Sequence, residues 1–387
     1  MAVGDLLVLG LAGFVTAALF YMVAVGSLNA LIFYRLQPTK LEDFGLRISV
    51  LIPARDEAAV IGKTVRRILA QNLPNLELLV LDDNSTDDTR AIAEQAADGD
   101  ARLQILSGRP LPPGWAGKNW ACHQLSQAAT GEIIIFSDAD VRWAPNALDA
   151  VVGLMAETQA DLLAVWPTQH TETWGERLVV PLMGFTIMTY LPVLATHHLS
   201  WDVFAAANGQ CLAFRRRAYD TIGGHEAVKD TVLEDMLLAR RIKRQRLRLR
   251  VADGAGLISC RMYETWPQVR DGYAKNILAG YGESVLFLAF GALFHWLVFL
   301  GPWLWLALGW LSDPLGVYPS WPLLLIALGS GVRALAAAAT RSRVIDALLM
   351  PVSVILMTQI AARSVYWYWR YGGPLWKGRV IQRARQG

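Results

Sequence analysis

Apolar positions in this chain form long uncharged runs near both ends and short clusters between polar residues in the middle. Residues 6–34 carry no charge, and as a helix they would extend roughly 43 Å, enough to cross a hydrocarbon layer about 30 Å thick. Further apolar runs lie at 284–312, 314–332 and 347–362. The pattern predicts an N-terminal transmembrane anchor (1–39), a polar domain (40–283) and a C-terminal membrane region (284–387).

The first run differs from a cleavable signal peptide, because no basic residue precedes it and its apolar stretch is too long. Arg35 and Lys40 follow it, and basic residues favour the cytoplasmic side of a membrane. We therefore expect an uncleaved anchor, a multi-pass protein of the cell (inner) membrane and a cytoplasmic middle domain.

Two other apolar runs are less suited to spanning. The run at 178–195 contains Pro181 and Pro192, which predicts a broken interfacial or re-entrant helix. The run at 347–362 is short for a span, and we favour a re-entrant segment slightly, which leaves two or three C-terminal hydrophobic segments.

The middle of the chain alternates between strand-like and helical patterns. Strand-like runs at 46–52, 76–81, 103–106 and 132–136 are separated by helical stretches, which predicts an α/β fold with a Rossmann-like, mostly parallel sheet. A polar cluster follows several of these runs directly. In open α/β sheets ligands bind at the carboxyl ends of the strands, so we expect the site there.

Composition narrows the class of function. Lysine and arginine outnumber the acids by 36 to 33, a net charge of +3 that is too small to indicate nucleic-acid binding. Cys122, Cys211 and Cys260 are far apart and form no CxxC pair, so we expect neither a disulfide framework nor a cysteine zinc site.

Two carboxylates at i and i+2, Asp138 and Asp140, follow the strand-like run 132–136. Side chains so placed can converge on Mg²⁺ or Mn²⁺, which bind one or two carboxylates together with phosphate oxygens. Such an ion would neutralise charge on a departing diphosphate. In the structural alternative, the two acids cap a helix near Pro145.

Two further acidic clusters also allow a structural and a chemical interpretation. Asp82 and Asp83 end a strand, where they could cap the next helix or accept hydrogen bonds from a nucleotide base or ribose. Glu234 and Asp235 begin a helix, where their charge offsets the dipole. A carboxylate there could also take the proton of an acceptor hydroxyl.

In their order along the chain, these motifs resemble those of family-2 glycosyltransferases of the GT-A fold, over residues 46–275. The matching stretches are Pro53-Ala54-Arg55-Asp56-Glu57, Asp82-Asp83-Asn84-Ser85-Thr86-Asp87, Gly117-Lys118, Asp138-Ala139-Asp140 and Glu234-Asp235. The resemblance implies a GT-A catalytic domain and an inverting, single-displacement transfer from a nucleoside diphosphate sugar.

The resemblance also implies roles for single residues. Asp235, beside Glu234, would be the general base, and Asp138 and Asp140 would bind Mg²⁺ or Mn²⁺. Lys118 would offset the diphosphate charge. The residues that would hold the donor are Pro53, Ala54, Arg55, Glu57, Asp82, Asp83, Lys118 and Asp138.

One family motif is missing from the sequence. Processive members carry QxxRW after the Glu-Asp pair, but this chain has Arg261-Met262-Tyr263-Glu264-Thr265-Trp266 and then Arg270. We expect Arg261, Tyr263, Trp266 and Arg270 on the acceptor side, with a lipid entering between the 178–195 helix and a helix at 266–281. The stretches 114–121 and 376–379 are similar to bacterial hopanoid-associated and carotenoid (chlorobactene-type) glucosyltransferases.

Three further features have bland interpretations. The basic run 240–250 holds seven lysines or arginines, which predict a solvated helix face or a contact with anionic headgroups. For His197-His198 we expect a polar surface or acceptor-side contact rather than zinc. Arg333 interrupts an apolar run and is expected to extend toward the headgroups.

The sequence therefore predicts a metal-dependent transferase that moves a hexose from a UDP-sugar to a hydroxyl of a membrane lipid such as a carotenoid or hopanoid. Glucose is the first candidate for the hexose. One alternative acceptor is a polyprenyl phosphate or a glycerolipid or ceramide-like lipid. The other alternative is a non-catalytic membrane scaffold that binds a nucleotide sugar. The expected partners are the nucleotide sugar, the lipid acceptor and the bilayer, without nucleic acid.

Overall fold

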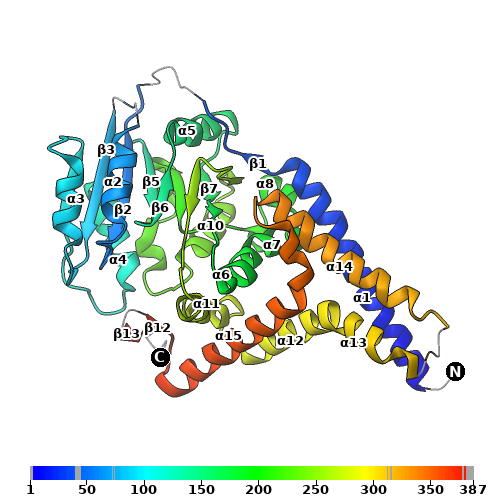
Figure 1. Cartoon of the computed structure of the whole chain (residues 1–387). Helices are drawn as coiled ribbons and strands as arrows, with labels where there is room; N and C mark the ends of the chain where they lie inside the picture. Colours follow the sequence, from blue (N-terminus) through cyan, green and yellow to red (C-terminus); the bar gives the residue numbers. More distant parts are fainter. Residues whose placement is uncertain are drawn as a thin grey trace. The chain divides into compact units, whose positions relative to one another are not determined.

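The structure is a computed structural model that describes residues 3–39, 45–71, 73, 75–311, 313, 316–376 and 379–380. Its contacts define two compact units, whose elements are labelled in Figure 1. The α/β unit combines Phe33–His170 with Val193–Met262. The helical unit combines the segment Thr171–Pro192 with the long helices near both ends of the chain.

The α/β unit is built on an eight-stranded sheet with the order β1-β10-β7-β9-β5-β2-β3-β4. Neighbouring strands are parallel except at β9, which runs antiparallel to both β5 and β7. The strands are β1 (Tyr34–Arg35), β2 (Ile48–Ala54), β3 (Leu76–Asp82), β4 (Leu103–Ser107), β5 (Ile133–Ser137), β7 (Leu162–Trp166), β9 (Cys211–Arg215) and β10 (Leu249–Asp253). The predicted α/β fold with a mostly parallel sheet is confirmed.

A second sheet of three strands has the order β6-β11-β8, with β6 (Val141–Trp143), β8 (Thr168–Gln169) and β11 (Ile258–Cys260). The helices of this unit are α2 (Ile61–Leu69), α3 (Thr89–Ala97), α4 (Gly117–Ala128), α5 (Ala147–Glu157), α8 (Val193–His198), η1 (Asp202–Phe204), α9 (Arg216–Thr221), η2 (Gly224–Val228) and α10 (Glu234–Arg244). The helical stretches expected between the strands are therefore present.

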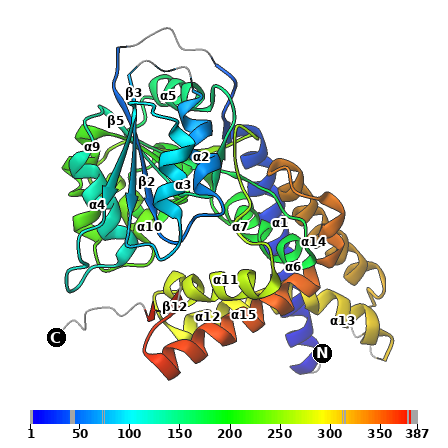
Figure 2. The ribbon, with the colours of Figure 1, turned by 60° about the vertical axis from the view of Figure 1, so that its left-hand side comes forward.

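The central strands are apolar on both faces because helices cover both faces of the sheet. Val50 and Ile52 of β2 belong to one core cluster with Ile61 of α2 and Ala93 of α3. Leu51 points the other way and is fully buried as well. Figure 2 shows α2 and α3 on one side of the sheet and α4 and α9 on the other.

The helical unit contains α1 (Val3–Ile32), α6 (Trp174–Val179), α7 (Pro181–Tyr190), α11 (Trp266–Gly280), α12 (Val285–His295), the π-helical turn η3 (Trp296–Leu300), α13 (Gly301–Leu308), η4 (Gly309–Leu311), α14 (Ser320–Ala339), η5 (Val344–Leu349) and α15 (Met350–Tyr371). A short hairpin follows, with β12 (Leu375–Trp376) and β13 (Arg379–Val380). This grouping differs from the predicted boundaries: the segments 171–192 and 263–283 pack with the apolar helices, because their own apolar faces are buried there.

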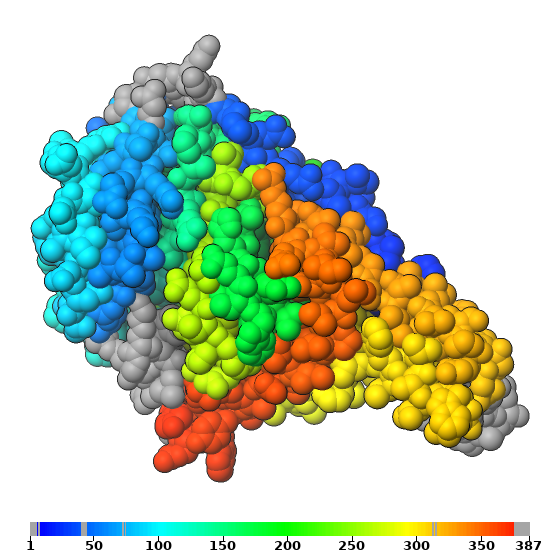
Figure 3. Space-filling view, viewed as in Figure 1, coloured from blue at the N-terminus to red at the C-terminus, as the bar shows by residue number. Residues whose placement is uncertain are grey.

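Four helical segments of the described chain are long and apolar enough to cross a membrane, at Val8–Ile32, Val285–Leu311, Ser320–Ala339 and Val344–Tyr371. Large apolar side chains on them face outward, including Phe20, Leu304 and Leu323. Figure 3 shows one such surface, formed by α13 in yellow and α14 in orange. A lipid-facing surface of this kind is expected for membrane helices.

The last of these helices is longer than its apolar run of 347–362. It continues to Tyr371, and Arg363, which ends the run, donates from Nη2 to Asp271 Oδ2 over 3.2 Å. The argument that the segment is too short to span is therefore wrong, although its topology stays a prediction. The break expected in 178–195 is confirmed, since α7 starts at Pro181 and ends at Tyr190.

Arg333 does not extend outward as expected. It is only 2% exposed, and its guanidinium lies 5.8 Å from the centre of the Phe185 ring. Here α14 packs against α7, and the aromatic face accepts the cation inside the helical unit.

The basic run 240–250 is not simply a solvated helix face either. Lys243 is 2% exposed and donates from Nζ to the carbonyls of Thr196 and Leu199, at 2.7 and 2.6 Å. Arg250 donates to the carbonyl of His197. His197 is itself buried and stacks on Tyr34, so its expected place on the surface is wrong. These side chains hold α8 against the sheet edge.

Candidate active site

Three neighbouring parallel strands bring the predicted polar clusters to one edge of the sheet. β5, β2 and β3 lie side by side, and their carboxyl ends lead into Asp138, Arg55 and Asp83. Ala54 pairs with Asp82 in the ladder, and its carbonyl accepts a hydrogen bond of 2.8 Å from the N–H of Asp83. The order of strands therefore places clusters that are far apart in the sequence next to each other.

Arg55 connects the ends of β2 and β3. Its Nη1 donates to the Asp83 carbonyl at 3.0 Å and lies 3.5 Å from Asp83 Oδ2. Asp56 beside it accepts from the backbone of Thr86 at 2.7 Å, and the N–H of Glu57 donates to Thr89 Oγ1 at 2.8 Å. Pro53 and Ala54 are the last residues of β2, so they can offer only backbone and apolar surface to a ligand.

The structural alternative for Asp82 and Asp83 does not hold. The N-cap position of the next helix, α3, is Asp88, and Asp87 accepts from the N–H of Thr89. Asp82 instead accepts from the N–H of Ser85 at 3.2 Å, within the turn after β3. The Asp83 carboxylate faces Gly117 at the start of α4, where an added Cβ would lie 3.7 Å from Asp83 Oδ2. The Asp83 carboxylate therefore lies close to the N-terminus of α4.

Asp138 and Asp140 do not cap a helix, because α5 begins only at Ala147 after the cap residue Asn146. Asp138 Oδ1 lies 2.8 Å from Nζ of Lys118, which comes from the first turn of α4. Asp140 Oδ2 accepts from the Cys260 thiol at 3.3 Å. The other oxygen of Asp140, Oδ1, is buried and has no partner within the described part of the chain.

Glu234 and Asp235 form the first turn of α10 and point into the same cluster. Glu234 Oε1 lies 3.1 Å from Lys118 Nζ, so this one cation bridges Glu234 and Asp138. Asp235 accepts from the N–H of Met236 at 2.7 Å and from the N–H of Gly209 at 2.9 Å. The predicted base and the predicted metal ligands are thereby brought together through Lys118.

The segment 208–210 before β9 belongs to this site, although the sequence arguments missed it. A Cβ at Gly209 would meet Lys118 Nζ at 3.3 Å and Glu234 Oε1 at 3.4 Å. Gln210 donates from Nε2 to Cys260 Sγ at 3.1 Å, which links it through Cys260 to Asp140. The only signal in the sequence was an Asn-Gly-Gln segment just before a strand, and such a segment is usually a turn.

The carboxylates of the cluster have altered acidities. Burial, together with the neighbouring Glu234 charge, raises the pKa of Asp235 to about 7. Burial and the nearby Asp138 charge raise the pKa of Asp140 to about 7 as well. Acids crowded in one weakly solvated place disfavour their own ionisation, and a cation bound by Asp138 and Asp140 would favour the ionised form of these two.

The carboxylates of this cluster fit a divalent cation for which the protein supplies only some of the ligands. No group of three or more His, Cys, Asp or Glu side chains with metal-binding geometry occurs among the residues that the structure describes. Asp138 and Asp140 can supply two carboxylates, and the unpartnered Asp140 oxygen is a free ligand atom. Mg²⁺ and Mn²⁺ sites of this kind are completed by phosphate oxygens and water.

The residues expected on the acceptor side divide between the two units. Arg261 ends the α/β unit, whereas Tyr263, Trp266 and Arg270 belong to the helical unit. There Trp266 begins α11 and lies 5.1 Å from the Trp174 ring, centre to centre. Arg270 Nε lies 2.8 Å from Asp271 Oδ1. Their role toward an acceptor stays a prediction.

Comparison with known proteins gives consistent matches. Residues 49–223 match the model of glycosyl transferase family 2. The 4,4'-diaponeurosporenoate glycosyltransferase of Staphylococcus haemolyticus (strain JCSC1435) is 28% identical over 242 residues, covering 60% of this chain and 61% of that protein. The protein of the same name from Staphylococcus aureus (strain MRSA252) is 27% identical over 266 residues, covering 66% of this chain and 68% of that one. The chain thus spans about three fifths to two thirds of the length of these relatives.

Among solved structures, the mannosyltransferase PcManGT from Pyrobaculum calidifontis, in complex with GDP-Man and Mn²⁺, has a similar fold. The TM-score is 0.56 at 20% sequence identity, over 92% of this chain and 98% of that chain. This likeness shows a GT-A-like α/β domain with a mostly parallel sheet. Residues 49–223 therefore match glycosyl transferase family 2, and the likeness to PcManGT concerns the fold.

Proposed function

We propose that this chain transfers a hexose from a nucleoside diphosphate sugar to a membrane lipid. Glucose is the first candidate for the hexose. The observation that supports this most is the Lys118 bridge, with Asp138 Oδ1 at 2.8 Å and Glu234 Oε1 at 3.1 Å. It joins a carboxylate that can bind a diphosphate-bound cation to the turn that carries Asp235. Donor binding and proton removal therefore take place within one small cluster.

The nucleotide would lie along the ends of β2 and β3. Asp82 and Asp83 offer carboxylate oxygens to the base or ribose, with Arg55 and Glu57 beside them and the backbone of Pro53 and Ala54 below. The diphosphate would then reach the start of α4, a helix N-terminus that favours anions. A UDP-sugar is the first candidate donor, and a GDP-sugar is the alternative because PcManGT contains GDP-Man.

Asp138 and Asp140 would hold Mg²⁺ or Mn²⁺ on the diphosphate. When bound, the ion supplies positive charge where the leaving oxygen becomes negative. Lys118 would leave the carboxylates and donate to the diphosphate, since a cation on Asp138 makes its present ion pair unnecessary. Glu234 stays next to Asp235 and keeps its pKa high until the acceptor arrives.

Asp235 is the proposed general base for a hydroxyl acceptor. The acceptor oxygen attacks C1 of the sugar, its proton passes to the Asp235 carboxylate, and the electron pair of the broken C1–O bond goes to the diphosphate. This single displacement inverts the configuration at C1. A base with a pKa of about 7 is well matched to this task near neutral pH.

The acceptor class is proposed to be an apolar lipid, a carotenoid or hopanoid or a similar molecule. The four candidate spans support a catalytic domain beside a bilayer, which we propose to be the cell membrane with the domain on its cytoplasmic side. The relatives from Staphylococcus are named for diaponeurosporenoate, a carotenoid acid. Its carboxylate is already ionised at neutral pH, so transfer to such an acceptor would not require proton removal by Asp235.

Two other functions remain as alternatives. A polyprenyl phosphate or a glycerolipid or ceramide-like acceptor would use the same donor site. A membrane scaffold that only binds a nucleotide sugar would not need Asp138, Asp140 and Asp235 in one cluster, and their connection through Lys118 favours an enzyme.

The direct test is a transfer assay on the purified full-length chain in detergent. It combines UDP- and GDP-sugars, Mg²⁺ or Mn²⁺, and a total lipid extract, with products identified by mass spectrometry. We expect a glycolipid from one donor, and its loss in Asp138→Asn. If no donor gives a product although the nucleotide binds, the scaffold function is correct instead.

The Asp235→Asn variant then separates the two acceptor chemistries. It should abolish transfer to a lipid hydroxyl, because Asp235 is the group that takes the proton in the proposed step. It should leave a substantial part of the transfer to a lipid carboxylate. Equal loss with both acceptors would show that Asp235 does not act as the base.

A further inference from the structure

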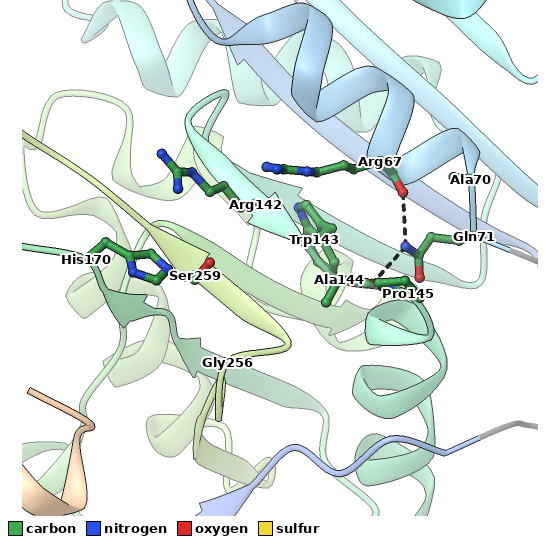
Figure 4. Close-up of a pocket in the computed structure, with 10 residues that line it drawn as sticks. All are labelled: Arg67, Ala70, Gln71, Arg142, Trp143, Ala144, Pro145, His170, Gly256 and Ser259. Carbon is green, nitrogen blue, oxygen red and sulfur yellow. Dashed lines mark hydrogen bonds between the residues drawn. The ribbon is translucent and has the colours of Figure 1, made fainter.

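A second recess lies in the α/β unit, apart from the carboxylate cluster. It has a volume of about 400 Å³ and lies where the end of α2 meets β6, β11 and the residue after β8. Figure 4 shows its walls, with Arg67 from α2, Gln71 just after it, Arg142 and Trp143 from β6, Ser259 from β11, and His170. Its volume suits a small molecule.

The recess is lined by basic groups without acidic ones. Arg67 and Arg142 are both exposed, and no carboxylate lines the recess in the described ranges. Arg67 lies in the last turn of α2, where a cation offsets the helix dipole, and this alone would account for an arginine at that position. Arg142 has no such explanation, because it lies in the middle of a three-residue strand and still faces the same space.

The wall behind these side chains is fixed. Gln71 Nε2 donates to the carbonyls of Arg67 and Ala144, both at 3.0 Å, which ties the end of α2 to the residue after β6 (Figure 4). Trp143 is 2% exposed and donates from Nε1 to Ser137 Oγ at 3.3 Å. The two arginine side chains therefore project from fixed backbone positions on one wall.

Two arginines that line one recess without an acid repel each other, and an anion bound between them would relieve this repulsion. Guanidinium groups match the oxygens of phosphate in pairs, and the His170 ring and the Ser259 hydroxyl add two more polar groups to the same wall. We propose that this recess binds a ligand through a phosphate group, either a phosphomonoester or the phosphodiester of a lipid headgroup.

This site is separate from the proposed donor site. Asp140 precedes β6, whereas the lining of the recess begins at Arg142, two extended residues or about 7 Å further along, and continues to Pro145. The two remain connected, since Ser259 in the recess neighbours Cys260, whose thiol donates to Asp140. A ligand in the recess is therefore connected to Asp140 through Ser259 and Cys260. The binding of a phosphate group in the recess does not depend on the proposed function.

Calorimetric titration of the full-length chain in detergent tests the proposal. The probes are glycerol 3-phosphate and dihexanoyl phosphatidylglycerol, each added without divalent cations so that diphosphate-type binding at Asp138 and Asp140 is disfavoured. Arg67→Gln, Arg142→Gln and the double variant are compared with Arg66→Gln, a matched control in the same last turn of α2 that does not line the recess. Unfolding temperatures show that all variants fold.

We expect binding of one ligand per chain, at least tenfold weaker in each single variant, absent in the double variant and within twofold of wild type in Arg66→Gln. Tighter binding of glycerol 3-phosphate would identify a soluble phosphomonoester as the ligand, and tighter binding of the lipid would identify a headgroup. The proposal is overturned if neither probe binds, if the double variant binds as well as wild type, or if Arg66→Gln weakens binding as much as Arg142→Gln.

Discussion

The N–H of Gly209 donates to Asp235 Oδ2 over 2.9 Å, so the segment that leads into β9 holds the carboxylate at the start of α10. The same glycine lies against Lys118 and Glu234, where a Cβ would be 3.3 and 3.4 Å from their charged atoms. No side chain fits there without moving one of these groups. Gly209 therefore maintains the spacing between the proposed base and the cation that bridges the cluster.

Replacing Gly209 with alanine should lower the transfer rate without unfolding the protein. The added methyl group must displace Lys118 Nζ or Glu234 Oε1 slightly, and because a misplacement of about 1 Å costs about a hundredfold in rate, this smaller one should lower kcat about twofold to tenfold. Gly331→Ala is the control, since a Cβ there meets nothing within 4 Å. Steady-state rates and unfolding temperatures of both variants give the comparison, and equal rates would remove Gly209 from the mechanism.

Transfer to a lipid hydroxyl should depend on pH through Asp235. The base acts as a carboxylate and its pKa is raised to about 7, so activity is full above that pH and is lost as the pH falls through it. We expect kcat/KM to drop close to tenfold per pH unit below about 6.5. Rates measured from pH 5.5 to 8.5 check this, and a constant rate over that range would contradict it.

The Cys260 thiol should affect the affinity for the metal ion rather than the affinity for the sugar donor. It donates to Asp140 Oδ2 at 3.3 Å and orients that carboxylate, and such outer contacts are worth at least tenfold in metal affinity. Cys260→Ala should raise the half-saturating Mn²⁺ concentration about tenfold, whereas Cys260→Ser, which keeps a donor, should stay close to wild type. Identical Mn²⁺ curves for the two variants would show that the contact is only structural.

A buried ion pair in the helical unit should contribute to stability. Arg177 Nε donates to Asp346 Oδ2 at 3.0 Å, and the Asp346 side chain is only 6% exposed. Asp346→Ala leaves Arg177 without its acid and should lower the free energy of unfolding.

The double variant Arg177→Met/Asp346→Leu is the control for this pair, because it replaces both charges with apolar groups. It should be more stable than Asp346→Ala alone when both are unfolded by detergent titration. If the two variants lose the same free energy, packing rather than the unpaired charge is the cause.

The alternation of apolar and polar runs was enough to predict the α/β sheet and the edge at which both Asp82 and Asp138 lie. It predicted the edge because parallel strands place their carboxyl ends together, whatever their separation in the chain. It could not predict Gly209 or Cys260, whose roles arise only from the antiparallel β9 and from the small sheet of β6, β11 and β8. Single residues without charge carry no pattern that distinguishes them beforehand.

Charged residues outside the cluster were harder to interpret, because a sequence shows charge and not its partner. Lys243 was expected in a solvated run, yet it is buried and donates to two backbone carbonyls. Arg333 was expected to extend outward, yet it lies over the Phe185 ring. In both cases a contact between elements distant in the sequence outweighs the preference of the side chain for water.

The most direct test of the central claim, that this sheet edge holds a nucleoside diphosphate through Asp138 and Asp140, is a titration of the full-length chain with UDP and GDP, with Mn²⁺ and with EDTA. We predict that one of the two binds at least tenfold more tightly with Mn²⁺, and that Asp140→Asn loses this difference. Asp98→Asn, at the exposed left-handed end of α3 where asparagine fits, should bind like wild type. Binding that is independent of Mn²⁺ and unchanged in Asp140→Asn would contradict the claim.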